Sequence, residues 1–557
     1  MSYLRSIFTT LILALILPFT LTGQQEEVRV VKPYTPTLSG AEKIQLLPDI
    51  DDTVDYENPE FEYSIFSKRY ETDYRVTPIK PARMVQPELD KLYKSELKLG
   101  AGNYLTPLAE LRINQVRSSN GTFGVLLKHH SMNGKVKLAN DKKVDAGFNE
   151  NDLEIYGKRF GRRTIFEYNA GASYDAYVHY GVDTAHADSV NRPDMTHPFF
   201  NAHAAVGFQS ARPDSLHLQY DGTLEYNFFT HDFDQVEHGV VLDGSIDQLF
   251  GDFRIGGDLG LQYFGHPAGW DTLFTTQFVA KLNPYISKSS AQWSFMAGLN
   301  TYTEIRDGNV KPKFYVRGKF SFNIVEEVIV PYFGVDGFQE TNNYMKIVGE
   351  NPYAVPGLMA TPTNHKLLAY VGLKGKVTDY LAYNFKGTYE AIDDQYFFVT
   401  DTSNYLNNQF IVRSDDLTLL NVYGELNIAP TESLRVFLKG NYYSYETSRE
   451  RYEGESYAWY KPNFDASLQA RYNLGDKILA DAGLFVIGPR YYPSLVAGGD
   501  PQKLNTTVDL NLGVEYRYTN LLSFWARFNN MTAQPYYLWH NYPSHRFRVM
   551  LGFTYGL

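Results

Sequence analysis

The stretch that decides the fold is residues 216–228, LHLQYDGTLEYNF. Apolar residues, aromatic residues or glycine occupy every second position, and polar residues such as Asp221 and Glu225 occupy the positions between them. Successive side chains of a strand point to opposite faces, so this period of two predicts a strand with one apolar and one polar face. The same alternation recurs at residues 464–474, 508–518 and 546–557.

The length of these runs separates a membrane barrel from a soluble sandwich. Many reach about 11 residues, which suits a membrane-crossing strand, whereas soluble strands centre near 5 or 6. About 22 such runs follow residue 93, and tight turns alternate with long polar connections, as in an outer-membrane barrel with both chain ends in the periplasm. The long connections are expected at residues 131–151, 183–196, 229–237, 341–363, 400–408 and 448–461. The sequence therefore predicts an all-β fold, a transmembrane antiparallel β-barrel of about 22 strands.

Composition agrees with this fold and excludes several other classes of protein. Aromatic residues make up 15% of the 557 residues, which suits strands and the aromatic girdles of a membrane barrel. Cysteine is absent, so disulfides, thiolate metal sites and cysteine nucleophiles are excluded. The net charge of -11 argues against nucleic acid as a partner, because such a protein needs a basic footprint.

Three segments divide the chain. Residues 1–23 have the pattern of a secretory signal peptide, with Arg5 before an apolar run and Gly23 as a small cleavage residue. Residues 24–92 are rich in proline and are expected to be an extended segment in the lumen or the periplasm. Residues 93–557 form the expected barrel, integral to a bacterial outer membrane, with the membrane lipid around it.

The alternation also predicts which charged side chains face the lumen. A lipid-facing Arg or Lys at the bilayer midplane costs about 2–4 kcal/mol, so charges on the strands are expected to point inward. The expected lumen-lining residues are the cations Arg317, Lys319, Arg435, Lys439, Arg471, Arg517, Arg546 and Arg548, and the anions Asp221, Glu225, Asp465, Asp509 and Glu515. They could form a selectivity lining, or they could pair across the lumen and hold the N-terminal segment, which carries Asp49, Asp51, Asp52 and Asp55.

The C-terminal residues resemble a known family. The stretches SFWARFNN (523–530), QPYYLW (534–539) and HRFRVMLGFTY (545–555), with Tyr542-Pro543 between the last two, resemble the closing hairpin of TonB-dependent receptors. Residues 76–84, 97–110 and 126–131 are similar to receptor-like barrels that lack the plug. The resemblance implies a barrel of about 22 strands. The C-terminal signal for the outer-membrane assembly machinery is expected at Phe553, Tyr555 and Leu557, although the chain ends in Gly-Leu rather than in an aromatic residue.

The N-terminal region departs from that family. Active uptake in the family requires a plug of well over a hundred residues behind a short TonB-binding box, and residues 24–92 are too few for that plug. Residues 27–31, EVRVV, could add a strand to a partner, but an extended tail is the simpler interpretation, so no TonB contact is expected. We expect the lumen to be filled by residues 24–92 together with inward-folded loops such as 341–363.

No catalytic, cofactor-binding or metal-binding residues are predicted. His231, Asp232, Asp234, Glu237 and His238 could bind a metal, yet their spacing specifies no geometry and a solvated outer loop explains them. The sequence has no nucleophile elbow and no His placed by spacing near a candidate Ser, which argues against a hydrolase. Two roles remain open: a channel for small solutes, or a barrel subunit that joins a surface lipoprotein, the assembly machinery or other outer-membrane subunits.

Overall fold

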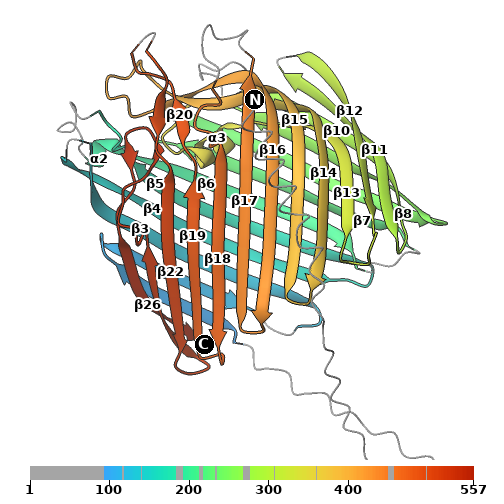
Figure 1. The fold of residues 1–557 in the computed structure, drawn as a ribbon, viewed down its shortest axis with the longest axis horizontal. Coiled ribbons are helices and arrows are strands. Elements are labelled where there is room, and N and C mark those ends of the chain that lie inside the picture. The colour runs from blue at the N-terminus through green and yellow to red at the C-terminus, as the bar shows by residue number, and fades with distance from the viewer. Residues whose placement is uncertain are drawn as a thin grey trace, which may run out of the picture. The chain divides into compact units, whose positions relative to one another are not determined.

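The computed structural model describes residues 93–557, apart from 116–117, 140, 184–191, 212–216, 233–234, 267–275, 307, 359, 449–456 and 497–498. These residues form a closed antiparallel barrel of 22 strands (Figure 1), which confirms the predicted fold class. The predicted signal peptide, the segment 24–92 and its acidic residues lie outside the described residues. Among the described residues, no helix is both long enough and apolar enough to span a membrane.

The strands follow one another around the barrel in chain order. They are β1 (Ser95–Gly102), β2 (Thr106–Asn114), β3 (Gly121–Lys137), β4 (Lys143–Phe160), β5 (Thr164–Val178), β6 (Thr196–Ser210), β7 (Gln219–His231), β8 (Gln235–Phe250), β9 (Phe253–Gly265), β10 (Thr276–Ser289), β11 (Trp293–Arg306), β12 (Asn309–Phe322), β13 (Val330–Glu340), β14 (Thr363–Thr378), β15 (Leu381–Thr400), β16 (Phe410–Thr431), β17 (Leu434–Thr447), β18 (Phe464–Leu474), β19 (Ile478–Ile487), β22 (Thr507–Arg517), β23 (Leu522–Asn529) and β26 (Arg548–Gly556). The connections carry the helices α2 (Arg192–Met195) and α3 (Tyr344–Glu350), and the short strands β20 (Arg490–Tyr492), β21 (Gln502–Leu504), β24 (Tyr537–Trp539) and β25 (Tyr542–Pro543).

The first and last strands close the ring. β1 pairs with β26 in antiparallel register, from Glu96 opposite Gly556 to Gly102 opposite Met550. Beyond the register, the backbone oxygen of Leu557 accepts hydrogen bonds from the amides of Lys94 (3.1 Å) and Ser95 (3.2 Å). Closure pairs the first strand with the last, so neither end strand leaves a free edge of the sheet. The seam between β12 and β13 is the shortest, with only four paired positions from Gly318 opposite Val335 to Ser321 opposite Tyr332.

The two faces of each strand differ as the alternation predicts. On β7, Leu224 and Tyr226 are 52% and 42% exposed, and Glu225 lies on the opposite face between them. Large apolar side chains are exposed in the same way on nearly all of the remaining strands of the ring. An apolar outer wall and a polar inner wall suit a barrel surrounded by lipid.

Connection lengths differ between the two rims. The rim at which β1 begins and β26 ends has tight turns, such as the one at Gly475 and Asp476, which both adopt positive φ. The opposite rim, here called the outer rim, carries the long connections. Two of the predicted long loops are shorter than expected. β3 continues to Lys137 and β4 begins at Lys143, so most of 131–151 is a hairpin. Likewise, β7 ends at His231 and β8 begins at Gln235, so 229–237 is largely strand. Polar residues on both faces above the membrane hide the period of two there.

Candidate functional site: a cap across the outer rim

Loops from opposite sides of the barrel touch at the outer rim. β5 is the fifth and β16 the sixteenth of the 22 strands, so they stand half the ring apart. The side-chain amide of Asn408, just before β16, nevertheless donates to the backbone oxygen of His179, just after β5, at 3.0 Å. The hydroxyl of Tyr542, from the connection between β23 and β26, donates to the backbone oxygen of Asn408 at 2.6 Å. Contacts between opposite walls have to pass over the lumen, so these loops cross the mouth.

A buried apolar cluster fills the space between the crossing loops. We call this cluster and the loops that build it the cap. Aromatic rings contact one another within it: Tyr353 stacks on Tyr542, with centroids 3.7 Å apart, and Tyr180 meets Tyr542 edge-on, with centroids 5.0 Å apart. The buried members come from residues 136–182 and 347–542: Val136, Leu138, Val144, Ala146, Val178, Tyr180, Val182, Ile347, Ala354, Ala360, Ile392, Tyr396, Phe397, Phe398, Val399, Leu406, Phe410, Leu417, Ala458, Trp459, Tyr460, Leu504 and Tyr542. Each fully buried large apolar side chain contributes about 1.5–3 kcal/mol, so burial of these residues stabilises the contacts between the loops.

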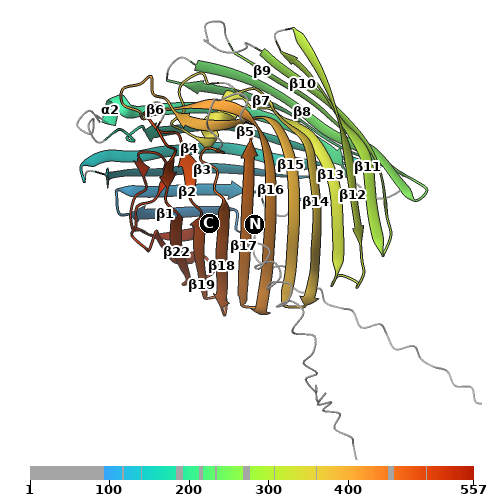
Figure 2. The same cartoon turned by 45° about the horizontal axis from the view of Figure 1, so that its top comes forward.

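The helix α3 belongs to the loop 341–363, which folds inward as expected. α3, α2 and β20 lie at the same end of the barrel in Figure 1, and Figure 2 brings that end forward. Seven residues are too few for a stable isolated helix, so packing has to hold α3 in place. Tyr344 and Ile347 are both 0% exposed, and Tyr344 clusters with Phe199 and Phe229 of the barrel wall.

A buried carboxylate holds the start of α3. Glu237, on β8, is 2% exposed. It accepts hydrogen bonds from the Asn343 side-chain amide (2.7 Å) and from the backbone amides of Tyr344 (2.7 Å) and Met345 (3.3 Å). Those amides at the start of a helix have no partner within it, so the carboxylate satisfies groups that would otherwise be buried unpaired.

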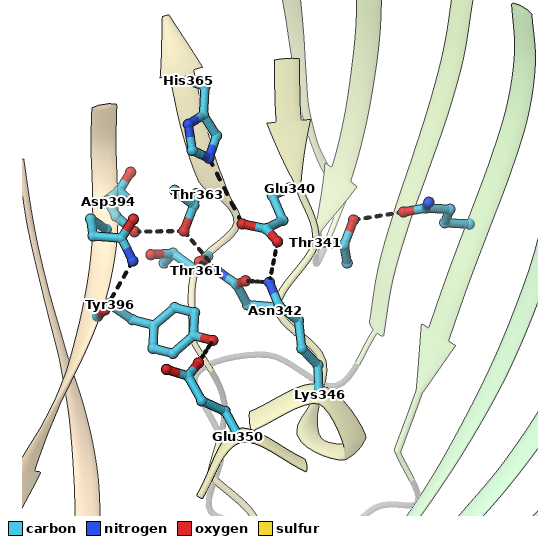
Figure 3. A network of polar contacts seen from close by, with 12 residues as sticks. Glu340, Thr341, Asn342, Lys346, Glu350, Thr361, Thr363, His365, Asp394 and Tyr396 are labelled. Carbon is cyan, nitrogen blue, oxygen red and sulfur yellow. Dashed lines mark hydrogen bonds and ion pairs between the residues drawn. The ribbon is translucent and has the colours of Figure 1, made fainter. Parts of the chain in front are cut away.

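A polar network ties the other side of the same loop to β13, β14 and β15 (Figure 3). The Lys346 ammonium lies 2.8 Å from a carboxylate oxygen of Glu340 and donates to the Asn342 side-chain oxygen at 2.6 Å. The Asn342 amide donates in turn to the Thr363 hydroxyl at 2.9 Å. At the end of α3, the Tyr396 hydroxyl donates to the Glu350 carboxylate at 2.6 Å. α3 is therefore fixed to the wall at both ends.

Two histidines inside the cap stay neutral. Burial holds the pKa of His179 well below its usual value, and His197 and His231 close by lower it further. Burial also lowers the pKa of His540 to about 4, against an opposing effect of Asp183. The cap is thus built from uncharged rings at neutral pH.

Several of the residues predicted to line the lumen are paired in the structure. The guanidinium of Arg317 lies 2.7 Å from the Asp258 carboxylate, and the Lys439 ammonium lies 3.4 Å from Glu425. The predicted anions also have partners; Asp221 accepts from Ser245, Glu225 from Asn227 at 2.8 Å, Asp465 from Asn441 at 3.1 Å, and Asp509 from the Asn530 backbone amide at 3.2 Å. Lys319 and Arg517 share their strands' inner faces with Arg317 and Glu515 respectively.

One predicted position is corrected. β26 begins at Arg548, so Arg546, which the alternation placed on the last strand, lies in the connection before it and is exposed. Arg548 itself lines a recess of about 390 Å³ in the wall. The C-terminal residues Phe553 and Tyr555 lie on the outer face of β26, opposite Leu99 and Leu97 of β1 in the register.

One recess of the inner wall gathers predicted and unpredicted charges. About 590 Å³ in volume, it brings together Arg435, Arg471 and Glu515, and adds Lys98, Asp481, Trp525 and Arg527. Trp525 lies between two cations, with Lys98 5.3 Å and Arg527 5.5 Å from its ring. In residues 523–530, Phe524 and Phe528 fall on one face of the strand and Arg527 on the other. The period of two could therefore also have predicted Arg527 as a residue of the inner face.

The residues 231–238, which the sequence predicts to be a solvated outer loop rather than a metal site, have several roles in the structure. Glu237 holds α3, and His238 accepts or donates a hydrogen bond with the Tyr226 hydroxyl at 2.8 Å. Asp234 lies outside the described residues. Only His231 and Asp232 remain close, and a third residue from β6, His197, joins them.

Comparison with known proteins identifies the fold. No family model matches the sequence, and no curated protein matches it. Solved structures do match: the FrpB iron transporter from Neisseria meningitidis (TM-score 0.65, 8% identity, 84% of this chain and 82% of that chain) and the copper transporter OprC (TM-score 0.62, 12% identity, 85% and 82%). The ferric enterobactin receptor PfeA from Pseudomonas aeruginosa matches at TM-score 0.60 and 10% identity, over 84% and 81%.

The barrel has the fold of the TonB-dependent receptors. It is an integral outer-membrane protein, as the sequence predicts. The three neighbours are transporters and receptors rather than enzymes, which fits the expectation of a protein without catalysis. At identities of 8–12% the likeness concerns the fold alone.

Proposed function

We propose that this chain is a closed outer-membrane barrel that serves as the membrane-embedded subunit of an envelope complex. The observation that carries the proposal is the cap: loops half the ring apart bond to each other over the lumen, through Asn408, His179 and Tyr542. A solute pore needs a mouth that is open or easily opened, whereas the loops that cross this mouth pack around a buried cluster of aromatic rings. A surface lipoprotein or another outer-membrane subunit is the partner we propose; a TonB contact forms no part of the proposal.

The pairing of the inner charges supports the same role. Arg317 on β12 is paired with Asp258 on β9, and Lys439 on β17 with Glu425 on the neighbouring β16, so these charges connect strands of the wall more than they attract a solute. Ion pairs held across strands stiffen the wall of a scaffold, although each exposed pair contributes only about 0–1 kcal/mol.

A second function, gated solute passage, is favoured by one observation. The recess around Arg435, Arg471 and Arg527 offers several cations against Asp481 and Glu515, in a cavity of about 590 Å³ large enough for a small anion. Passage would require a partner to displace the cap. The fold is also that of barrels named as transporters.

Purification from native membranes separates the two functions. An affinity tag fits in the tight turn at Gly251, where added atoms would meet nothing within 4 Å. We expect the tagged chain, solubilised in mild detergent at its native level, to bring down one partner in about equal amount, measured by quantitative mass spectrometry. An unrelated outer-membrane barrel with the same tag serves as the control. A chain that purifies alone and conducts ions would contradict the proposal.

A further inference from the structure

Three side chains with metal-binding atoms converge at the outer rim beside the cap. His197 is on β6, His231 ends β7, and Asp232 follows it. One carboxylate oxygen of Asp232 lies 3.0 Å from Nδ1 of His197, and the other lies 3.0 Å from Nε2 of His231. The three ligand atoms all lie within 4.8 Å of one another. Ligands of a tetrahedral zinc, bound at about 2.0–2.2 Å, stand about 3.4 Å apart, so small side-chain movements suffice to receive an ion.

Burial holds the two imidazoles in place. The side chain of His231 is 1% exposed and that of His197 is 12% exposed, whereas Asp232 is 28% exposed and reaches solvent. The His231 ring stacks on Phe199, with centroids 4.5 Å apart. The rigid part of the site is therefore the imidazole pair, and the carboxylate is the part that can adjust to an incoming ion.

A third histidine lies against this group. The ring centroid of His179 is 4.4 Å from that of His197, and His179 is 1% exposed. Its Nε2 lies 3.2 Å from the backbone oxygen of Pro352, so that nitrogen is the protonated donor and Nδ1 is the bare one. Nδ1 is buried and has no hydrogen-bond partner among the residues that the structure describes. An imidazole whose far nitrogen donates to a carbonyl is the arrangement that metal-binding histidines adopt.

We propose that His197, His231 and Asp232 bind a divalent late transition metal, Zn²⁺ in the first place, with His179 beside them as a further imidazole. Imidazole and carboxylate ligands suit zinc and copper, and the absence of thiolates and of an all-oxygen shell argues against soft monovalent copper and against Ca²⁺ or Mg²⁺. Glu237 and His238, which are near in sequence, are not ligands, because Glu237 holds α3 and His238 bonds to Tyr226.

The site is placed where a bound ion would fasten the cap. His231 contacts Phe199, which clusters with Phe229 and with Tyr344 of α3. His179 begins the connection that crosses the mouth and bonds to Asn408. An ion bound by residues of the neighbouring strands β6 and β7 would fix the end of this strand pair to the part of the cap that contacts it.

The test is metal binding by the full chain, purified in detergent and stripped with a chelator. We expect wild type to bind one equivalent of Zn²⁺ in titration calorimetry with micromolar or tighter affinity. Loss of a residue that only hydrogen-bonds to a metal ligand weakens metal binding about 10–100-fold. We expect Asp232→Asn, which changes an exposed side chain, and His197→Ala to weaken Zn²⁺ binding by more than that. His238→Ala is the matched control and should bind as wild type does.

A spectroscopic measurement keeps the test independent of folding in the variants. Cu²⁺ added at one equivalent to wild type should give an electron paramagnetic resonance spectrum with couplings to at least two imidazole nitrogens. The proposal is overturned if wild type shows no saturable site for Zn²⁺, if Cu²⁺ shows no nitrogen coupling, or if folded Asp232→Asn and His197→Ala bind Zn²⁺ as tightly as wild type. The last result would mean that the two histidines and the aspartate form only a hydrogen-bonded triad.

Discussion

Replacement of residues 344–360 by a short glycine-serine linker is expected to convert the closed barrel into a conducting one. The replaced segment contains α3 and contributes Ile347, Tyr353 and Ala354 to the cap. Barrels of 16–18 strands already leave an aqueous channel, and this one has 22. We expect the single-channel conductance in planar bilayers to rise by at least about tenfold once this segment no longer covers the lumen.

The control for this replacement alters the opposite rim. A linker of the same composition in place of residues 326–328, in the exposed turn between β12 and β13, should leave the conductance unchanged. The conductance of both variants should be recorded in the full chain and in a chain without residues 24–92. The comparison separates the effect of the replaced loop from any effect of residues 24–92. An unchanged conductance in both backgrounds after replacement of 344–360 would show that this loop does not close the mouth.

Tyr542→Ala is expected to loosen the cap by about 3–5 kcal/mol, the usual effect of truncating a buried aromatic side chain. Tyr542 is 3% exposed, stacks on Tyr353 and packs against Tyr180 and Phe410. Since about 1.4 kcal/mol changes an equilibrium tenfold, amide hydrogen exchange in residues 344–360 should become more than 100-fold faster. The strands away from the outer rim should keep their protection, because their hydrogen bonds join neighbouring strands.

Two further variants separate stacking from hydrogen bonding. Tyr542→Phe keeps the rings together and removes only the bond to the Asn408 backbone oxygen, so an effect of about 1 kcal/mol is expected. Tyr405→Ala changes a tyrosine of the same rim that is 67% exposed and should alter exchange by less than about 0.5 kcal/mol. Equal exchange in Tyr542→Ala and Tyr405→Ala would mean that the rings at the centre do not hold the cap.

The sequence predicts the wall of the barrel well. A period of two depends only on the alternation of side chains along one strand, so residues 216–228 reveal both faces of β7 without any knowledge of neighbouring strands. The prediction weakens where the chain leaves the membrane. Above the lipid, both faces of β3 and β4 can be polar, so the hairpin around Lys137 and Lys143 looks like a loop.

The cap could not be predicted in this way. Its contacts join residues far apart in the chain, such as Glu237 with Tyr344 and His179 with Asn408, and no local pattern encodes a partner on the opposite wall. Glu237 illustrates the difficulty, since its neighbours His231 and Asp232 made it look like a metal ligand in a solvated loop. Likewise His197 is distant in sequence from His231, so only the pairing of β6 with β7 brings the two together.

The most direct test of the closed mouth uses the absence of cysteine from the chain. Ser467→Cys places one thiol on the inner face of β18, opposite the exposed Leu468, and Thr402→Cys places one on the exposed surface of the outer rim. Intact cells are treated with a bulky, membrane-impermeant maleimide. A closed cap predicts that Cys at position 402 is labelled and Cys at position 467 is not, until the outer membrane is disrupted. Labelling at 467 in intact cells, as fast as at 402, would contradict it.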